Sequence, residues 1–351
     1  MNRINTIENT DALSGLKLLD SESIDCCITS PPYFGLRDYK VEGQVGLEKT
    51  FDEYIDKLIQ IFNQVKRVLK KTGSCWVVMG DTYNGSKNGN TQGTGKSWLH
   101  GNNSGTYLKE KVGVKKAVAG IADKSLLLIP ERFAMKMIDN GWILRNKLIW
   151  HKNNCMPSSA KDRFTIDYEF IYFFTKSEKY YFKTQYEPYS EATLKEFGQI
   201  YNGKGIKDYE AAGVQNPSDV KRRIIAKFPI GGVKHVGRNF RSNDLTYSGN
   251  PWNPVQYGRI ARTVWRINTK PFKEAHFAVF PQELVRKMID PGCPPDGICL
   301  DPFMGAGTVA LVALKMNRSF IGFDLNKEYV EMANKRINPY LHQMKIDIGI
   351  E

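Results

Sequence analysis

The sequence predicts an α/β fold with a mostly parallel sheet, because short apolar runs alternate with amphipathic stretches near both ends of the chain. Two polar segments, 84–124 and 186–262, interrupt this alternation and show no hydrophobic period. The chain has 351 residues, of which 41% are hydrophobic, so it is long enough to bury a substantial core. We therefore expect one α/β domain that carries a mobile loop and an inserted module.

The first half of the chain begins with a buried central strand at 24–30, a continuous β-prone run that follows a polar stretch and ends in a Pro-Pro turn. A helix is expected over 51–73, where apolar residues form one stripe at helical spacing and Gly73 ends the helix. The stripe consists of Tyr54, Leu58, Ile61, Phe62, Val65, Val68 and Leu69. The other elements expected here are a strand at 74–83, a helix at 126–141, and strands at 142–152 and 168–177.

The α/β alternation returns after the second polar segment. A helix is expected within 276–290, and a strand, a Gly-rich turn and a helix follow within 297–317. A last strand and helix lie within 318–337. We therefore expect 1–185 and 263–340 to form one domain, with 186–262 as an inserted region and 341–351 as a tail.

Charge and cysteine content narrow the class of protein. The 50 Lys and Arg residues exceed the 37 Asp and Glu residues, and the net charge of +13 fits a polyanionic partner such as nucleic acid. The two polar segments hold about ten of the thirteen excess positive charges. The six cysteines form no CxxC pair, which argues against a zinc site and a disulfide framework. The same cysteine pattern indicates a reducing cytoplasm as the compartment, and no apolar run approaches the length of a membrane span.

The TSPPY turn at 29–33 follows the predicted central strand and carries the strongest chemical signal. Its two prolines lack backbone N–H groups and keep the chain out of helical geometry, so carbonyl oxygens face the cleft beyond the strand. Acceptors without competing donors suit an exocyclic NH₂ group, whose two hydrogens would be accepted by Ser30 Oγ and the Pro31 carbonyl. Tyr33 would supply a flat face for an unstacked base. A rigid turn that only closes the strand is the alternative.

The segment LDPFMGAGT at 300–308 is a second signal, since an apolar strand enters a Gly-rich turn and then a helix. Such a turn lets a ligand approach the backbone near a helix N-terminus. Ala310 replaces the third glycine of a dinucleotide motif and Asp301 would repel a pyrophosphate, so an amino-bearing ligand fits better. Asp324 ends the following strand, where nucleotide-binding sheets place the acidic residue that holds a ribose diol. A helix cap is the alternative role for each Asp.

These motifs resemble those of the S-adenosylmethionine-dependent DNA amino-methyltransferases in which TSPPY or DPPY precedes FxGxG, here at 303–307. The resemblance covers 1–183 and 264–340. It implies a Rossmann-like methyltransferase fold with a circularly permuted sheet, and S-adenosyl-L-methionine as the cofactor with no metal. It also implies double-stranded DNA as the partner, a flipped base as the substrate, and a target-recognition region at 186–262.

The resemblance also assigns the site residues. The catalytic residues it implies are Ser30, Pro31, Pro32 and Tyr33. The cofactor-binding residues it implies are Asp11, Phe280, Asp301, Pro302, Phe303, Gly305, Gly307, Thr308 and Asp324. Three further sequences resemble later motifs of the family, namely GDTY at 80–83, WHK at 150–152 and HFAVFP at 276–281. The family usually has a Gly before the residue that corresponds to Asp11, and this chain has Thr10 instead.

The activity implied by the resemblance is site-specific methylation of an exocyclic amino group in DNA. Ser30 favours cytosine N4, because the Ser-type motif is typical of cytosine-N4 enzymes and the Asp-type motif of adenine-N6 enzymes. Adenine-N6 methylation is the first alternative, and a non-catalytic DNA-binding protein of the same fold is the second. A bacterial, archaeal or phage-encoded cytoplasmic protein is expected, with a cognate restriction endonuclease as a candidate partner. The recognition sequence and the choice between monomer and homodimer stay open.

Overall fold

The computed structural model describes residues 3–36, 38–39, 41–85, 118, 120–158, 160–189, 259–270 and 279–347. The chain divides into two compact units, Met1–Lys183 with Thr263–Glu351, and Thr184–Arg262. In the second unit the described residues include an antiparallel pair, β6 (Tyr186–Glu187) and β7 (Arg259–Ile260). Most of the predicted loop 84–124, most of the predicted target-recognition region 186–262, and 276–278 of the HFAVFP motif lie outside the described residues.

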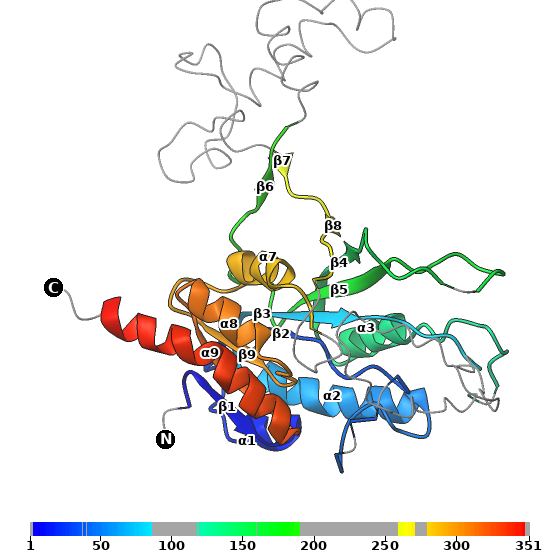
Figure 1. Cartoon of the computed structure of the whole chain (residues 1–351), viewed down its shortest axis with the longest axis horizontal. Helices are drawn as coiled ribbons and strands as arrows, with labels where there is room; N and C mark the ends of the chain where they lie inside the picture. The colour runs from blue at the N-terminus through cyan, green and yellow to red at the C-terminus, as the bar shows by residue number, and fades with distance from the viewer. Residues whose placement is uncertain are drawn as a thin grey trace, which may run out of the picture. The chain divides into compact units, whose positions relative to one another are not determined.

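An eight-stranded sheet forms the centre of the first unit (Figure 1). Its strands are β1 (Thr6–Asn9), β2 (Ile24–Thr29), β3 (Leu69–Met79), β4 (Ile143–His151), β5 (Tyr168–Thr175), β8 (Val264–Arg266), β9 (Ile298–Asp301) and β10 (Ser319–Asp324). The order is β1-β10-β9-β2-β3-β5-β4-β8, and only β5 runs antiparallel to its neighbours. The C-terminal strands β9 and β10 thus lie between the N-terminal strands β1 and β2, and the predicted mostly parallel, permuted sheet is confirmed.

Helices cover both faces of this sheet (Figure 1). One layer contains α1 (Ala12–Lys17), α2 (Phe51–Val68) and α3 (Ile129–Asp139). The other contains α7 (Gln282–Gly292), α8 (Thr308–Lys315) and α9 (Lys327–Asp347). Each layer packs its apolar side chains into its own core cluster, so the first unit has three layers with the sheet in the middle.

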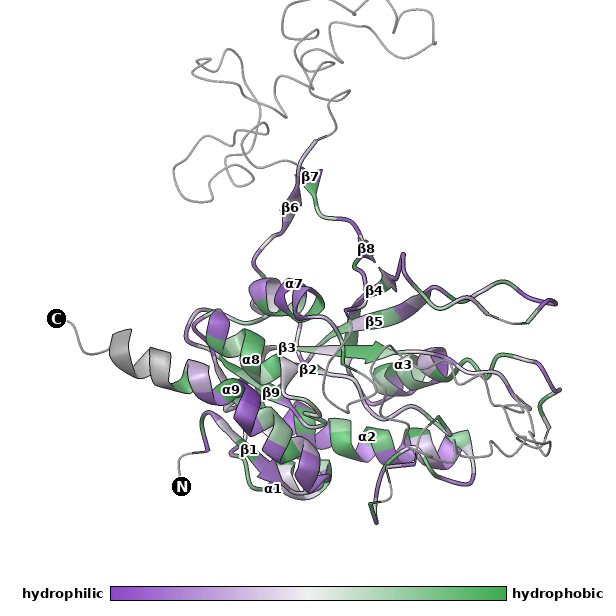
Figure 2. Ribbon diagram, viewed as in Figure 1, coloured by the Kyte–Doolittle hydropathy of each residue, from purple (hydrophilic) through white to green (hydrophobic). Residues whose placement is uncertain are grey.

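The central strand β2 is buried along its whole length, as its continuous β-prone sequence predicts. Successive side chains of a strand point to opposite faces, so Cys27 packs with the α1–α3 layer while Cys26 and Ile28 pack with the α7–α9 layer. The apolar character of the inner strands and of the helix faces toward them is visible in Figure 2. Both cysteines are therefore core residues.

The prediction that Gly73 ends the second helix is wrong. The helix α2 ends at Val68, and β3 begins at once with Leu69, whose backbone is already extended. Gly73 lies inside β3, where a Cβ would be 3.1 Å from the Asp25 carbonyl oxygen of the neighbouring strand. The glycine therefore permits a close approach between β2 and β3, and strand pairing rather than a helix cap sets the boundary.

The remaining elements differ from the expected ones mainly at their ends. The third strand ends at Met79 instead of reaching Tyr83, so the GDTY sequence forms the connection beyond it. The last helix continues to Asp347, into the segment expected to be a tail. Among the described helices, none combines the length and apolar content that a membrane span requires.

Candidate active site

A cavity of about 860 Å³ opens at the carboxyl ends of β2 and β9. These two strands pair in parallel, and the chain leaves them in opposite directions along the sheet, from β2 toward β3 and from β9 toward β10. The following helices, α2 and α8, pack on opposite faces. Such a reversal leaves a crevice beyond the strand ends, which is where open α/β sheets bind ligands.

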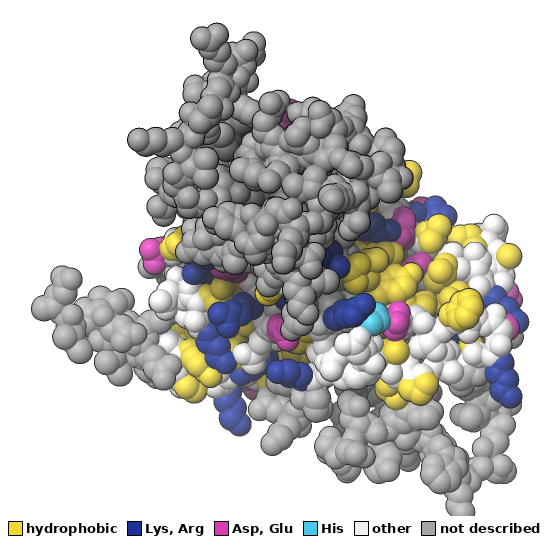
Figure 3. Space-filling model, turned by 90° about the horizontal axis from the view of Figure 1, so that it is seen from above, with side chains coloured by type: hydrophobic (Ala, Val, Ile, Leu, Met, Phe, Trp, Pro, Cys, Tyr) yellow, Lys and Arg dark blue, Asp and Glu magenta, His cyan; other side chains and the backbone are white. Residues whose placement is uncertain are grey.

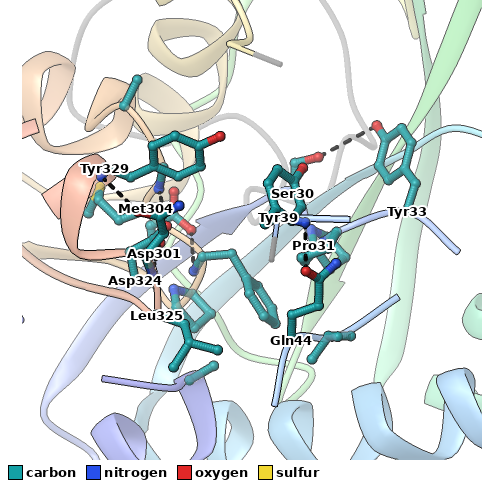
Figure 4. A pocket seen from close by; sticks show the side chains of 18 of the residues that line it. Ser30, Pro31, Tyr33, Tyr39, Gln44, Asp301, Met304, Asp324, Leu325 and Tyr329 are labelled. Carbon is teal, nitrogen blue, oxygen red and sulfur yellow. Dashed lines mark hydrogen bonds between the residues drawn. The ribbon is translucent and has the colours of Figure 1, made fainter. Parts of the chain in front are cut away.

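The TSPPY turn forms one wall of the cavity (Figure 4). The buried Tyr54 of α2 donates a hydrogen bond to the Pro32 carbonyl at 2.8 Å, which anchors the turn to the helix. Ser30 Oγ donates to the Tyr33 hydroxyl over a long 3.5 Å, and Tyr33 in turn donates to Glu169 Oε2 at 2.7 Å. Burial and the charge of Glu169 raise the pKa of Tyr33, so the phenol keeps its proton. Both side chains that the sequence assigns to the substrate are thus held in the cavity wall.

Two charged side chains that the sequence did not assign lie beside the TSPPY turn. Lys152 and Glu169 form an ion pair, and both line the cavity. The Lys152 ammonium also lies 4.3 Å from the centre of the Trp150 ring. Gly80 leaves room for the arrangement, because a Cβ there would be 3.0 Å from Tyr33 Cε2 and 3.4 Å from Glu169 Cγ. This close packing against Gly80 restricts the side chains of Tyr33 and Glu169 to one conformation.

Asp301 forms the opposite wall of the cavity, at the end of β9. The side chain is 1% exposed, and its Oδ1 accepts hydrogen bonds from Thr29 Oγ1 at 2.6 Å and from the Phe303 N–H at 3.0 Å. Burial raises the pKa of Asp301 to about 7, although these two hydrogen bonds oppose the rise. Among the described residues, no Lys or Arg forms an ion pair with Asp301. A buried carboxyl group in this state favours a cationic ligand.

Asp324 ends β10 and holds the Gly-rich turn in place. Its Oδ2 accepts from the Gly305 N–H at 2.7 Å, and its Oδ1 accepts from the Asn326 N–H at 2.8 Å. Burial raises the pKa of Asp324, while the two backbone hydrogen bonds lower it. Each carboxylate oxygen keeps a second lone pair, so Asp324 can position the turn and still accept a hydrogen bond from a ligand.

The other residues assigned to the cofactor divide into those in the cavity wall and one outside it. Asp11, Phe280, Pro302, Phe303, Gly305 and Thr308 line the cavity together with Asp301 and Asp324. Asp11 also caps α1 by accepting from the Ser14 N–H at 2.9 Å. Burial would raise its pKa, but this and other local hydrogen bonds outweigh burial and leave the pKa below its usual value. Gly307 instead begins α8 with φ of 73°, where a Cβ would be 2.8 Å from Ala333 Cβ, so its role is to let α8 and α9 approach.

Figure 4 shows the cavity residues as two groups that face one space. Asp301, Met304, Asp324, Leu325 and Tyr329 form one group, and Ser30, Pro31, Tyr33, Tyr39 and Gln44 form the other. Gln44 Oε1 accepts from the Tyr39 N–H at 2.7 Å, and the Tyr39 and Tyr329 rings meet edge to face at 6.0 Å. The sequence did not indicate Tyr39, Gln44 or Tyr329, which stand in irregular or helical segments without a motif.

Comparisons with known proteins identify the family of the chain. The model of the N6_N4_Mtase family, described as DNA methylase, matches residues 24–335. The Type II methyltransferase M.Cfr9I of Citrobacter freundii is 35% identical over 339 residues, which is 95% of this chain and 87% of that protein. The Type II methyltransferase M.XycI of Xanthomonas campestris pv. cyanopsidis is 35% identical over 342 residues, which is 95% of this chain and 88% of that protein.

Solved structures show the same fold. The PvuII DNA methyltransferase (cytosine-N4-specific) superposes with a TM-score of 0.56 at 17% identity, over 96% of this chain and 91% of that one. A putative DNA modification methylase of Thermus thermophilus, in complex with S-adenosyl-L-methionine, superposes with a TM-score of 0.52 at 16% identity, over 95% and 93% of the two chains. Because the family model spans most of the chain and full-length relatives share a third of its residues, the chain belongs to the N6_N4_Mtase family of DNA methyltransferases, whose cofactor is S-adenosyl-L-methionine.

Proposed function

We propose that the protein methylates the exocyclic N4 of a cytosine in double-stranded DNA. The observation that carries the proposal is that one cavity joins the TSPPY turn to the buried carboxyl group of Asp301. The turn offers acceptors for an amino group, and the carboxyl group suits a cationic ligand. Ser30 in place of an Asp favours cytosine N4 over adenine N6, because it resembles the Ser-type motif of cytosine-N4 enzymes.

The cavity fits the cofactor on the chemistry of its side chains. S-adenosyl-L-methionine supplies an electrophilic methyl group on a sulfonium and carries a cationic α-amino group. Asp301 would bind that ammonium, since it is a buried carboxyl group without an ion-pair partner among the described residues. Asp324 would accept from the ribose hydroxyls, and Phe280 and Phe303 would supply apolar surface. Gly305 would let the ligand approach the backbone, and Asp11 would accept from the adenosine.

The TSPPY turn would act on the amino group of the base. An aromatic amine is a weak nucleophile because its lone pair is delocalised into the ring. Hydrogen bonds accepted by Ser30 Oγ and the Pro31 carbonyl would favour a pyramidal nitrogen and aim its lone pair across the cavity. Pro32, fixed by Tyr54, would keep both acceptors in place. Transfer of the methyl group would break its bond to the sulfonium, which becomes an uncharged thioether, and would leave the base nitrogen with four substituents. The proton of this cationic nitrogen is acidic and would pass to water without a strong base.

Access to a paired base requires that it leave the duplex, as other enzymes that modify bases achieve by flipping. Lys270, which is exposed and lines the cavity, would contact a phosphate near the flipped base. Figure 3 shows further Lys and Arg side chains spread among apolar and acidic ones on one face of the molecule. We propose 186–262 as the target-recognition region on its sequence, since most of it lies outside the described residues.

Methylation of unmethylated phage DNA, followed by nucleoside analysis with mass spectrometry, tests the proposal. The expected product is N4-methylcytosine; N6-methyladenine would establish the adenine alternative, and the absence of both would refute methylation of an amino group in DNA. Ser30→Ala and Tyr33→Ala are expected to slow transfer while the Kd for S-adenosyl-L-methionine stays unchanged. Equal loss of cofactor binding in these variants would contradict the separate roles of the two walls.

A further inference from the structure

A chain of polar contacts connects the TSPPY turn to a buried ion pair. Lys152 pairs with Glu169 Oε1, Glu169 Oε2 accepts from Tyr33, and Tyr33 accepts from Ser30. We infer that Glu169 and Lys152 are positioning residues that orient the hydroxyl hydrogens of Tyr33 and Ser30 away from the cavity, so that Ser30 acts as an acceptor. This inference rests on the proposed function, in which Ser30 accepts a hydrogen from the base.

The number of available hydrogens fixes the direction of the hydrogen bonds among Ser30, Tyr33 and Glu169. An ionised carboxylate only accepts hydrogen bonds, and a phenol has a single hydrogen to donate. Since the hydrogen of Tyr33 is donated to Glu169, the oxygen of Tyr33 is available to Ser30 only as an acceptor. The hydrogen of Ser30 is then directed to Tyr33, and the lone pairs of Ser30 are left for a donor in the cavity. Without the carboxylate, each hydroxyl would be free to rotate and present its hydrogen to the base.

The surroundings keep the chain of contacts in one arrangement. The side chains of Lys152 and Glu169 are 18% and 19% exposed, so water screens their attraction less than that of a surface pair. The ammonium also lies over the Trp150 ring, and Gly80 leaves only enough space for Tyr33 and Glu169 to pack together. A carboxylate that is paired and packed in this way holds the phenol hydrogen at a defined position, which a solvent-exposed carboxylate would not do.

A double-mutant cycle on the full-length protein tests the inference. The single-turnover rate of tritiated methyl transfer to unmethylated phage DNA is measured for Glu169→Gln, Tyr33→Phe and the double variant, together with the Kd for S-adenosyl-L-methionine by calorimetry. A hydrogen bond to a charged group corresponds to a rate change of roughly 10- to 100-fold, which is the slowing expected for Glu169→Gln. The Kd is expected to stay unchanged. In the Tyr33→Phe background, Glu169→Gln is expected to cause no further slowing, because no hydroxyl remains to be oriented.

The matched control is Glu131→Gln, which removes the carboxylate of another partly buried ion pair, with Lys147, outside the cavity wall. It is expected to transfer methyl groups at the wild-type rate. If Glu169→Gln slows transfer equally with and without the Tyr33 hydroxyl, the positioning role is refuted. The role is also refuted if Ser30→Ala and Tyr33→Phe slow transfer but Glu169→Gln does not, and the proposed function would then survive. A wild-type rate for Tyr33→Phe would refute the positioning role alone, because Phe keeps the ring face. A wild-type rate for Ser30→Ala would instead refute the catalytic role proposed for the turn.

Discussion

Replacement of Asp301 by Asn tests whether the chain keeps a destabilising carboxyl group in the cavity for a ligand. Burial raises the pKa of Asp301 to about 7 in the folded protein, whereas the same carboxyl group ionises near 3.8 without burial. The folded state therefore retains a proton that the unfolded chain releases between these two pH values. Because the folded state binds more protons there, the free energy of unfolding of the ligand-free protein falls as the pH rises through this interval.

The size of the effect follows from the two pKa values. At about 1.4 kcal/mol per pKa unit, ionisation of Asp301 lowers the stability of the ligand-free protein by about 4 kcal/mol at pH 8. Asn keeps an acceptor for Thr29 Oγ1 and the Phe303 N–H but carries no charge. Between pH 5 and pH 8, the wild type is therefore expected to lose roughly 3 kcal/mol more of its free energy of unfolding than Asp301→Asn.

Urea denaturation at the two pH values without cofactor measures this difference, and calorimetry measures binding of S-adenosyl-L-methionine. Asp301→Asn is expected to be more stable than the wild type at pH 8 and to bind the cofactor at least roughly tenfold more weakly. Asp162→Asn, at an exposed position, is the control and is expected to change neither quantity. The same pH slope in Asp301→Asn and the wild type would refute the raised pKa, and unchanged cofactor binding would refute the assignment of Asp301 to the ammonium.

Two further substitutions test the packing of the cavity walls, and a third tests the contact between α8 and α9. Gly80→Ala places a methyl group 3.0 Å from the Tyr33 ring. It is expected to slow single-turnover methyl transfer roughly tenfold and to leave the Kd for S-adenosyl-L-methionine unchanged. A wild-type transfer rate would contradict the close packing of Gly80 against Tyr33. Tyr54→Phe removes the donor to the Pro32 carbonyl, so the free energy of unfolding in urea is expected to fall by about 1 kcal/mol and methyl transfer to slow. A wild-type transfer rate would show that the turn does not depend on this bond. Gly307→Ala combines a positive φ with a contact of 2.8 Å to Ala333, so the free energy of unfolding is expected to fall by about 2–3 kcal/mol. The control is Gly43→Ala, where φ is also positive but the Cβ would meet nothing within 4 Å. Equal losses of stability in the two variants would refute the role of the contact.

The parts of the fold that were predicted from the sequence are those in which local pattern and tertiary packing agree. The strand β2 has a continuous β-prone sequence because both of its faces are covered, and α3 has a helical period because only one of its faces is covered. Gly73 was misassigned because glycine is typical of helix ends, while its actual position depends on the approach of β3 to the Asp25 carbonyl. That approach is a tertiary contact, which no local pattern contains.

The site shows the same division. Ser30, Asp301 and Asp324 stand in motifs and at strand ends, so their common position followed from the expected sheet. Glu169 stands 136 residues from Tyr33 in a strand of aromatic residues, and nothing near it in the sequence indicates a role. One signal was available: Lys152 and Glu169 bear opposite charges near the end of the β4–β5 pair where the chain connects the two strands, and Trp150 lies opposite Glu169 there. Cross-strand pairing predicts that such charges meet.

The order of the motifs along the chain matters less for the chemistry than the pairing of the strands that carry them. Cys27 of β2 lies opposite Leu300 of β9, so both strands reach the cavity together although their motifs are 272 residues apart. This register brings Thr29 Oγ1 within 2.6 Å of Asp301 Oδ1, to which it donates a hydrogen bond. Thr29 directly precedes Ser30, so this bond fixes the start of the turn. The turn therefore cannot shift against the carboxyl group without loss of a buried hydrogen bond to a titratable group. A circular permutation that keeps this pairing keeps the two walls of the site at a fixed separation, which is the requirement for transfer between two bound ligands.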